Sequence, residues 1–175
     1  RMDDGPSYAA PVAVGAVMEG QTVAEVLQST VADVAVGDHV LAPGGWQNHA
    51  VLSAAALGRR LDAAGLPLST ALGVFGMPGF TAYSSLHEIA RLKPGETLVV
   101  AAASGPVGAT VAQLARLQGA RVVAIAGGAA KQAYLRTLGV DVALDHRAAD
   151  FAKQPRVAVP DGIDVYFENV GGHVL

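Results

Sequence analysis

The sequence predicts an α/β protein in which a parallel β-sheet with helices follows a smaller, mainly antiparallel β region. Hydrophobic residues make up 51% of the 175 residues, which is enough for a substantial core. In the second half, short apolar runs alternate with helical segments, a pattern typical of parallel strands joined by helices. In the first half, Gly and Pro separate the apolar runs, which favours strands joined by tight turns.

Composition argues against several classes of function. A formal net charge of −3 provides no broad basic surface, so nucleic acid is not an expected partner. The longest apolar stretches, such as residues 97–103, are shorter than the ~20 residues that cross a bilayer, so we expect no membrane association. The chain has no Cys and no His-Glu-x-x-His pattern, so we expect no metal site and no disulfides. A reducing compartment, the cytoplasm, is the expected location.

The N-terminal region is expected to form part of a small β-barrel or sandwich. Gly37-Asp38 can make the turn into a strand that ends near Leu41, and residues 47–52 are predicted to supply another strand. Two helices are predicted to follow at residues 68–75 and 80–92. Pro78 and its neighbouring glycines interrupt them. We expect one domain at residues 1–75 and a second at residues 76–175.

The second domain is expected to alternate strands with helices. Gly119 and Gly139 stand where helix-ending glycines occur. Pro155 falls within the last predicted helix and indicates a kink, a shorter helix or a loop there. The strands are predicted at residues 97–102, 121–126, 141–144 and 163–167, and the helices at residues 107–118, 130–138 and 149–157.

A glycine-rich segment lies between the first of these strands and the first helix. In the dinucleotide fingerprint G-x-G-x-x-G, the first glycine makes a tight turn, the second lets the backbone approach pyrophosphate, and the third lets helix pack on strand. Ala103 replaces the first glycine, while Gly105 and Gly108 keep the spacing. Pro106 can open a helix whose free N–H groups bind phosphate. Similar turns also occur in α/β proteins that bind no nucleotide.

The next turn indicates which dinucleotide would bind. An NAD site has Asp or Glu about 20 residues after the glycine-rich turn. Residues 126–131 contain no acid there but do contain Lys131, which could pair with the 2′-phosphate of NADPH as a point charge. His146 and Arg147 follow the third strand at the same edge of the sheet and could complete an anion pocket. A solvated lysine and ordinary loop surface are the alternative interpretations.

Three motifs stand in order along the chain: Gly-Met-Pro-Gly-Phe-Thr-Ala-Tyr at 76–83, Ala-Ala-Ser-Gly-Pro-Val-Gly at 102–108, and Asp-Val-Tyr-Phe-Glu-Asn-Val-Gly-Gly at 164–172. Together they resemble the zinc-independent medium-chain dehydrogenase/reductases, in particular the group of prostaglandin reductases, leukotriene B4 12-hydroxydehydrogenases and curcumin or alkenal reductases. The resemblance runs from Arg1-Met2 to the last residue. It implies part of a GroES-like β-barrel domain followed by the N-terminal part of a Rossmann NADPH-binding domain.

The resemblance also implies site residues. His146 stands where the family usually has a tyrosine at the 2′-phosphate, and a histidine there could make phosphate affinity depend on pH. Trp46 is a candidate for the wall of the substrate pocket, although a lone Trp is commonly a packing residue. The resemblance assigns these residues to the cofactor: Gly105, Pro106, Val107, Gly108, Lys131, His146, Asn169 and Thr81.

The activity that the resemblance implies is NADPH-dependent reduction of the carbon–carbon double bond of a small α,β-unsaturated ketone or aldehyde. A homodimer is expected by the same resemblance. Family members are roughly twice this long, so we expect a partial chain that is inactive alone. We name no catalytic residue, because the family's substrate-side tyrosine belongs to a segment outside this sequence. The alternatives are a zinc-free NADPH quinone oxidoreductase and a non-catalytic NADPH-binding structural or regulatory protein.

Overall fold

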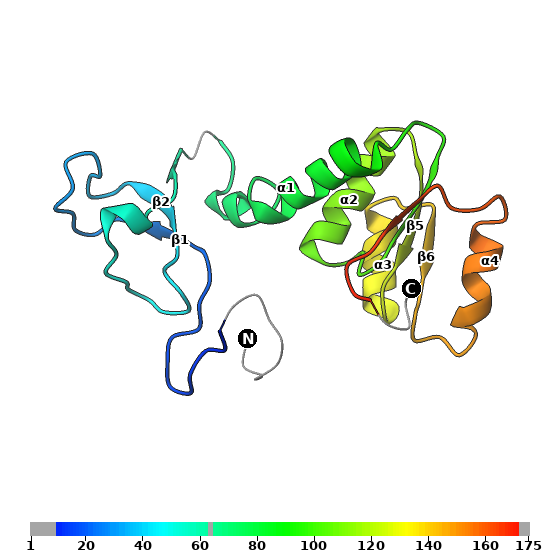
Figure 1. Ribbon diagram of the computed structural model, residues 1–175, viewed down its shortest axis with the longest axis horizontal. Helices are drawn as coiled ribbons and strands as arrows, with labels where there is room; N and C mark the ends of the chain where they lie inside the picture. The colour runs from blue at the N-terminus through cyan, green and yellow to red at the C-terminus, as the bar shows by residue number, and fades with distance from the viewer. Residues whose placement is uncertain (1–9, 63–64, 172–175) are drawn as a thin grey trace. The chain divides into compact units, whose positions relative to one another are not determined.

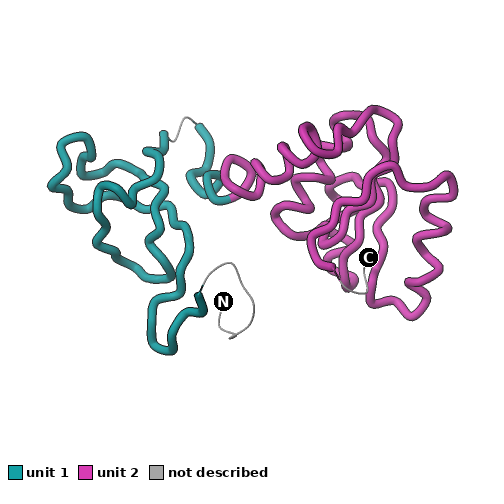
Figure 2. Tube along the Cα trace, viewed as in Figure 1, with its two compact units in different colours: residues 1–72 teal, residues 73–175 magenta. Residues whose placement is uncertain are grey.

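The computed structural model describes residues 10–62 and 65–171. Its chain divides into two compact units, Arg1–Leu72 and Gly73–Leu175 (Figure 2). The domain boundary expected after residue 75 stays a prediction for the whole protein. Gly172, the last residue of the third motif, lies outside the described residues.

The first unit contains a three-stranded antiparallel sheet with the order β1-β2-β3. Its strands are β1 (Thr22–Glu25), β2 (His39–Ala42) and β3 (Arg60–Leu61). Along β2 the more buried positions alternate with less buried ones, because successive side chains of a strand point to opposite faces. The expected antiparallel β region is therefore confirmed.

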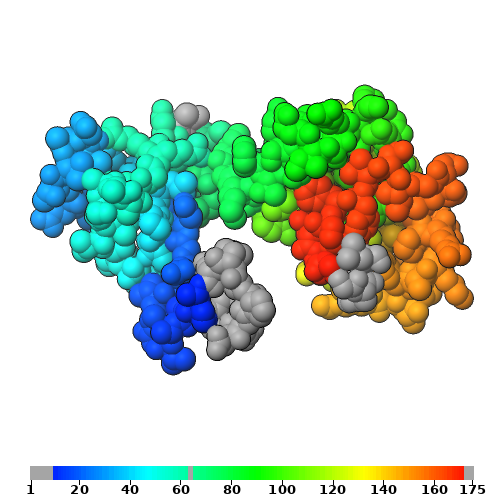
Figure 3. Space-filling model, viewed as in Figure 1, coloured from blue at the N-terminus to red at the C-terminus, as the bar shows by residue number. Residues whose placement is uncertain are grey.

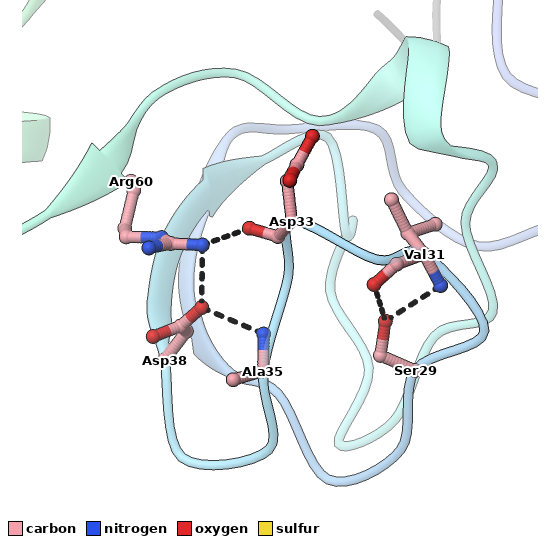
Figure 4. A network of polar contacts seen from close by, with 6 residues as sticks. All are labelled: Ser29, Val31, Asp33, Ala35, Asp38 and Arg60. Carbon is pink, nitrogen blue, oxygen red and sulfur yellow. Dashed lines mark hydrogen bonds and ion pairs between the residues drawn. The ribbon is translucent and has the colours of Figure 1, made fainter.

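A polar network fixes the turn that leads into β2 (Figure 4). The Asp38 carboxylate accepts the N–H of Ala35 at 2.8 Å and pairs with the Arg60 guanidinium at 2.9 Å. Arg60 also donates to the carbonyl of Asp33. Gly37 has a φ of 90°, which a residue without a Cβ adopts readily. The turn predicted at Gly37-Asp38 is confirmed.

One prediction for the first 75 residues is wrong, and a second is confirmed only in part. Residues 47–52 form no strand: all six are exposed, and no described strand lies beside them to pair with their backbone. The helical segment predicted at residues 68–75 is present but shorter: it is a 3-10 helix, Leu68–Leu72, followed by a turn. The carbonyl of Gly73 accepts the N–H groups of Gly76 and Gly79, at 3.0 and 3.2 Å, so the backbone bends there instead of continuing a helix.

The helix that follows begins earlier than predicted. Helix α1 spans Met77–Ser84 and continues as a π-helical turn, Ser85–Ala90. Pro78 occupies its first turn, where the missing N–H has no helical partner to lose. Pro78 therefore starts this helix, whereas the sequence analysis took it as an interruption.

The second unit is built on a four-stranded parallel sheet with the order β6-β5-β4-β7 (Figure 1). All four strands lie within the predicted ranges, and each is one to two residues shorter than predicted. They are β4 (Thr97–Val100), β5 (Arg121–Ile125), β6 (Val142–Leu144) and β7 (Val165–Phe167). The predicted fold class, a partial Rossmann-like parallel sheet preceded by antiparallel strands, is confirmed.

Helices cover both faces of this sheet. Helices α1, α2 (Pro106–Leu117) and α3 (Ala129–Thr137) pack on one face, in a cluster with Leu98 and Val122. Helix α4 (Gln154–Ala158) packs on the other face, in a cluster with Val99 and Val123. Strands buried on both faces are mainly apolar, and β4 and β5 are apolar after their first residues, Thr97 and Arg121.

Helix ends follow local sequence signals. Gly119 and Gly139 follow α2 and α3 with φ values of 82° and 76°, as expected of helix-ending glycines. The helix predicted at residues 149–157 is shorter, because Pro155 fits only the first turn of a helix. A 3-10 turn, Phe151–Lys153, precedes it, and this segment forms part of the surface of the second unit, orange in Figure 3.

The core makes a direct prediction about stability. Val111 of α2 is fully buried. We expect Val111→Ala to lower the free energy of unfolding by about 2 kcal/mol, because two buried methyl groups are lost at ~0.8 kcal/mol each and a cavity remains. Urea unfolding measures this. The control is Val157→Ala on α4, where the side chain is 80% exposed and the change should stay below about 0.5 kcal/mol. Equal losses would contradict the assigned core.

Within residues 10–62 and 65–171, the helices are all too short or too polar to span a bilayer.

Candidate nucleotide-binding site

The turn between β4 and α2 lies at the carboxyl edge of the parallel sheet. Ala102 adopts a left-handed conformation with a φ of 46°, and its carbonyl accepts the N–H of Gly105 at 2.9 Å. Ala103 is fully buried, and its N–H donates to the carbonyl of Ile125 at 3.0 Å. The strained backbone position is therefore Ala102. Ala103, which stands at the place of the first fingerprint glycine, is not strained. An alanine can fill the Ala103 position because its φ is not positive.

The two glycines of this turn have different surroundings. A Cβ on Gly108 would lie 2.6 Å from the carbonyl oxygen of Ala102 and 2.7 Å from the Cα of Ala103. Helix α2 thus packs on the turn too closely for any other residue. A Cβ on Gly105 would contact only the Ala102 oxygen, at 3.3 Å, and would otherwise meet open space. Gly105 therefore leaves room for a ligand to approach the backbone.

Helix α2 begins at Pro106, directly after Gly105. The first N–H groups of a helix have no intrahelical acceptor, and the helix dipole favours negative charge at that end. Val107 and Gly108 supply such groups in the first turn. This end of α2 can bind a phosphate.

The neighbouring turn, between β5 and α3, is covered by two basic side chains. A Cβ on Gly127 would lie 2.6 Å from Nε2 of His146 and 2.7 Å from Nε of Arg147, so both side chains lie against the Gly127 backbone. Lys131 is exposed in the first turn of α3. The structure thus brings His146 and Arg147 together, at the turn from which the helix carrying Lys131 begins.

The sequence analysis missed Asp145, which links the same two segments. Its carboxylate accepts the N–H of Gly128, at 3.1 Å to each oxygen, and the N–H of Arg147 at 2.9 Å. The N–H groups of Arg147 and Gly128, more than the nearby positive charges of His146 and Arg147, hold its pKa below the usual 3.8. The turn thus has an acid after all, supplied by the segment after β6.

This arrangement predicts the titration of Asp145. Its pKa is lower in the folded than in the unfolded chain, so its contribution to stability is complete above pH 3.8 and is lost as the pH falls through the folded value. We expect carboxyl ¹³C NMR to give a midpoint below 3.8, and the amide shifts of Gly128 and Arg147 to follow the same curve. In the Asp145→Asn variant, the amide shifts of Gly128 and Arg147 should not change with pH in this range. A midpoint at or above 3.8 would contradict the observed hydrogen bonds.

Gln132 is a second residue that the sequence analysis missed. It is only 6% exposed, and its Nε2 donates to the carbonyls of Ala126 at 2.5 Å and Leu144 at 2.9 Å. It therefore ties the carboxyl ends of β5 and β6 together beside the basic side chains. A polar residue on the inward face of an amphipathic helix was the available signal.

Asn169 lies beside the glycine-rich turn. Its side-chain N–H donates to the carbonyl of Ala101 at 3.1 Å. Glu168 accepts the N–H of Gly171 at 2.6 Å and that of Val170, and these bonds hold the pKa of Glu168 below its usual value. After β7, residues 168–171 therefore fold back on the Glu168 carboxylate, and Asn169 lies at the end of β4.

The remaining two candidates are Thr81 in α1 and Trp46 in the first unit. The hydroxyl of Thr81 donates to the Met77 carbonyl at 2.8 Å, within α1. Trp46 belongs to the first unit and is 79% exposed; its indole lies over Gly20, whose Cβ would be 3.5 Å from Nε1. A shallow, largely apolar hollow of that unit is lined by other residues, among them Val34 and Leu57.

Among the described residues, no three His, Asp or Glu side chains lie close enough to share a metal ion.

Comparisons with known proteins match both units. A family model described as the N-terminal domain of oxidoreductases matches residues 1–59, and one described as zinc-binding dehydrogenase matches residues 106–175. NADPH-dependent curcumin reductase of Escherichia coli K12 is 54% identical over 100% of this chain and 51% of its own length. Prostaglandin reductase 1 of Rattus norvegicus is 46% identical over 90% of this chain and 49% of its own length.

A solved structure is similar throughout. The crystal structure of CurA from Vibrio vulnificus in complex with NADPH has a TM-score of 0.88 and 49% identity, covering 98% of this chain and 51% of that one. The chain thus spans about half the length of the relatives it matches.

An antiparallel sheet followed by a parallel sheet with a glycine-rich turn after an inner strand is the arrangement of a Rossmann-type dinucleotide-binding fold. The chain belongs to the medium-chain dehydrogenase/reductase family, in the zinc-independent branch that contains the curcumin and prostaglandin reductases.

Proposed function

We propose that the whole protein uses NADPH to reduce the carbon–carbon double bond of α,β-unsaturated ketones or aldehydes. The observation that carries the proposal is the close packing of α2 on the glycine-rich turn, next to a second turn covered by basic side chains. The names of two similar proteins support it, since one is called an NADPH-dependent curcumin reductase and the other was crystallised with NADPH.

The residues present fit this cofactor. Gly105 leaves an open approach to the backbone, and Gly108 sets the helix close to the turn, so pyrophosphate is proposed to bind at Gly105, Pro106, Val107 and Gly108. Lys131 and His146 are proposed to bind the 2′-phosphate. Asn169 and Thr81 are proposed as further contacts with the cofactor.

The reaction adds a hydride, which nicotinamide supplies, to the β-carbon of the enone, and a proton to the α-carbon. The described residues contribute binding and orientation: they fix the phosphate end of the cofactor and so limit where its other end can lie. A group that stabilises the developing enolate is expected outside this sequence. For this reason the chain alone is proposed to be inactive.

Further features of the whole protein follow from the same proposal. We propose a GroES-like substrate domain at residues 1–75 and an NADPH-binding domain from residue 76 on, in a cytoplasmic homodimer. Trp46 is proposed to form part of the substrate pocket wall, because its exposed indole is available for contact with an apolar ligand.

The test compares an enone with a quinone. Full-length protein is assayed for NADPH oxidation with 4-phenyl-3-buten-2-one and with 1,4-benzoquinone. We expect kcat/KM to be at least tenfold higher for the enone. Faster turnover of the quinone would favour the quinone oxidoreductase alternative. If NADPH binds but no enone or quinone of a broader panel is reduced, the protein is a binding protein and not an enzyme.

A further inference from the structure

The side chain of Arg147 lies against the β5–α3 turn, beside the imidazole of His146. We propose that Arg147 is a specificity-determining residue, whose guanidinium binds the 2′-phosphate on the adenosine ribose of NADPH. This inference rests on the proposed function and adds a residue to it.

The placement of Arg147 depends on the absence of a side chain at Gly127. A Cβ there would lie 2.7 Å from Nε and 3.0 Å from Cδ of Arg147, as well as 2.6 Å from Nε2 of His146. These distances are shorter than van der Waals contact, so any larger residue at position 127 would displace both basic side chains. The guanidinium also reaches the next residue, since Nη1 lies 3.9 Å from a Cβ built on Gly128.

Hydrogen bonds of Asp145 fix the backbone on which the Arg147 side chain is carried. Its carboxylate accepts the backbone N–H of Arg147 and that of Gly128, which joins the segment after β6 to the first residues of the β5–α3 turn. The backbone of Arg147 is thus fixed beside the turn. Asp145 also brings a negative charge, which would repel a phosphate unless cations outweigh it. Lys131 and Arg147 are the permanent cations at this edge, and the imidazole of His146 lies beside them.

Arginine suits this task better than the other two. A guanidinium is planar, presents several N–H donors in a fork, and stays charged throughout the physiological range. Imidazole changes its charge between about pH 5 and 8. Within the described part of the chain, the Arg147 guanidinium forms no ion pair, so its donors are available to a ligand. Arg147 therefore supplies a permanent charge beside His146, which occupies the position of the usual tyrosine.

The experiment measures binding, not turnover. Full-length protein is titrated calorimetrically with adenosine 2′,5′-diphosphate and with adenosine 5′-diphosphate, which lacks the 2′-phosphate. We expect Arg147→Gln to weaken the first ligand about 10- to 100-fold, as loss of a charge-assisted hydrogen bond does, and to change the second less than about twofold. Arg147→Lys should fall between wild type and Arg147→Gln.

Two further variants distinguish a specific contact of Arg147 with the phosphate from a general effect of net charge or of folding. Arg156→Gln removes an exposed arginine of α4 and should change neither affinity. Gly127→Ala should weaken the 2′,5′-diphosphate selectively, and adding it to Arg147→Gln should cost little more, because both act on the same contact.

The outcomes are distinct. If wild type prefers the 2′,5′-diphosphate and Arg147→Gln keeps that preference, the role of Arg147 is wrong while the proposed function stands. If Arg147→Gln weakens both ligands equally, Arg147 is not specific for the phosphate. If wild type shows no preference between the ligands, the NADPH assignment in the proposed function is itself wrong.

Discussion

Lys131→Ala in the full-length protein is expected to weaken NADPH binding about 10- to 100-fold and to leave NADH binding within about twofold. Lys131 is exposed in the first turn of α3, next to the turn that His146 and Arg147 cover. A charge-assisted hydrogen bond contributes about 1.5–3 kcal/mol, and only NADPH has a 2′-phosphate to receive it. Fluorescence titration with each reduced cofactor measures both affinities.

The matched control is Lys153→Ala, which removes another exposed lysine of the same unit. It should leave both affinities unchanged. That result would show that the weaker NADPH binding of Lys131→Ala does not come from loss of net positive charge alone. Equal weakening of NADPH and NADH by Lys131→Ala would show that Lys131 does not recognise the 2′-phosphate.

Gly108→Ala is expected to weaken NADPH and NADH together, by about 10- to 100-fold, and to lower the free energy of unfolding by about 1–3 kcal/mol. The added Cβ would lie 2.6–2.7 Å from backbone atoms of Ala102 and Ala103, which cannot rotate away as a side chain can. Helix α2 must therefore shift from the turn, with the cost of an overpacked core and a misplaced phosphate site. Urea unfolding and cofactor titration measure the two effects.

Gly105→Ala is the informative comparison. Its Cβ would approach only one atom, the Ala102 oxygen at 3.3 Å, so the free energy of unfolding should change by less than about 0.5 kcal/mol. Binding of both cofactors should still fall, because the methyl group would occupy the approach to the backbone. If Gly105→Ala destabilises as much as Gly108→Ala, the two glycines do not divide these tasks.

The parallel sheet could be predicted because its signals are local. β4 and β5 are short apolar runs bounded by glycines, and Gly119 and Gly139 end helices by their own backbone freedom. The N-terminal unit was harder. Residues 47–52 end in the short apolar run Ala-Val-Leu, yet a strand exists only where another strand pairs with its backbone. No property of the six residues themselves reports that partner.

The glycine-rich turn also has one feature that could be predicted from the sequence and one that could not. The spacing of Gly105 and Gly108 was enough to locate the glycine-rich turn, because close packing of helix on strand leaves room only for glycine at a fixed place. The turn's left-handed residue was not predictable, because Ala102 is held in that conformation by the hydrogen bonds around it.

In the second unit, local sequence pattern was enough to predict the order of strands and helices, the glycine-rich turn, and the basic residues Lys131, His146 and Arg147. The folded chain was needed to see that His146 and Arg147 both lie against Gly127, and that Asp145 and Gln132 join the ends of β5 and β6 beside them. The physical reason is that local pattern fixes each element, whereas pairing between parallel strands brings together loops from distant parts of the chain.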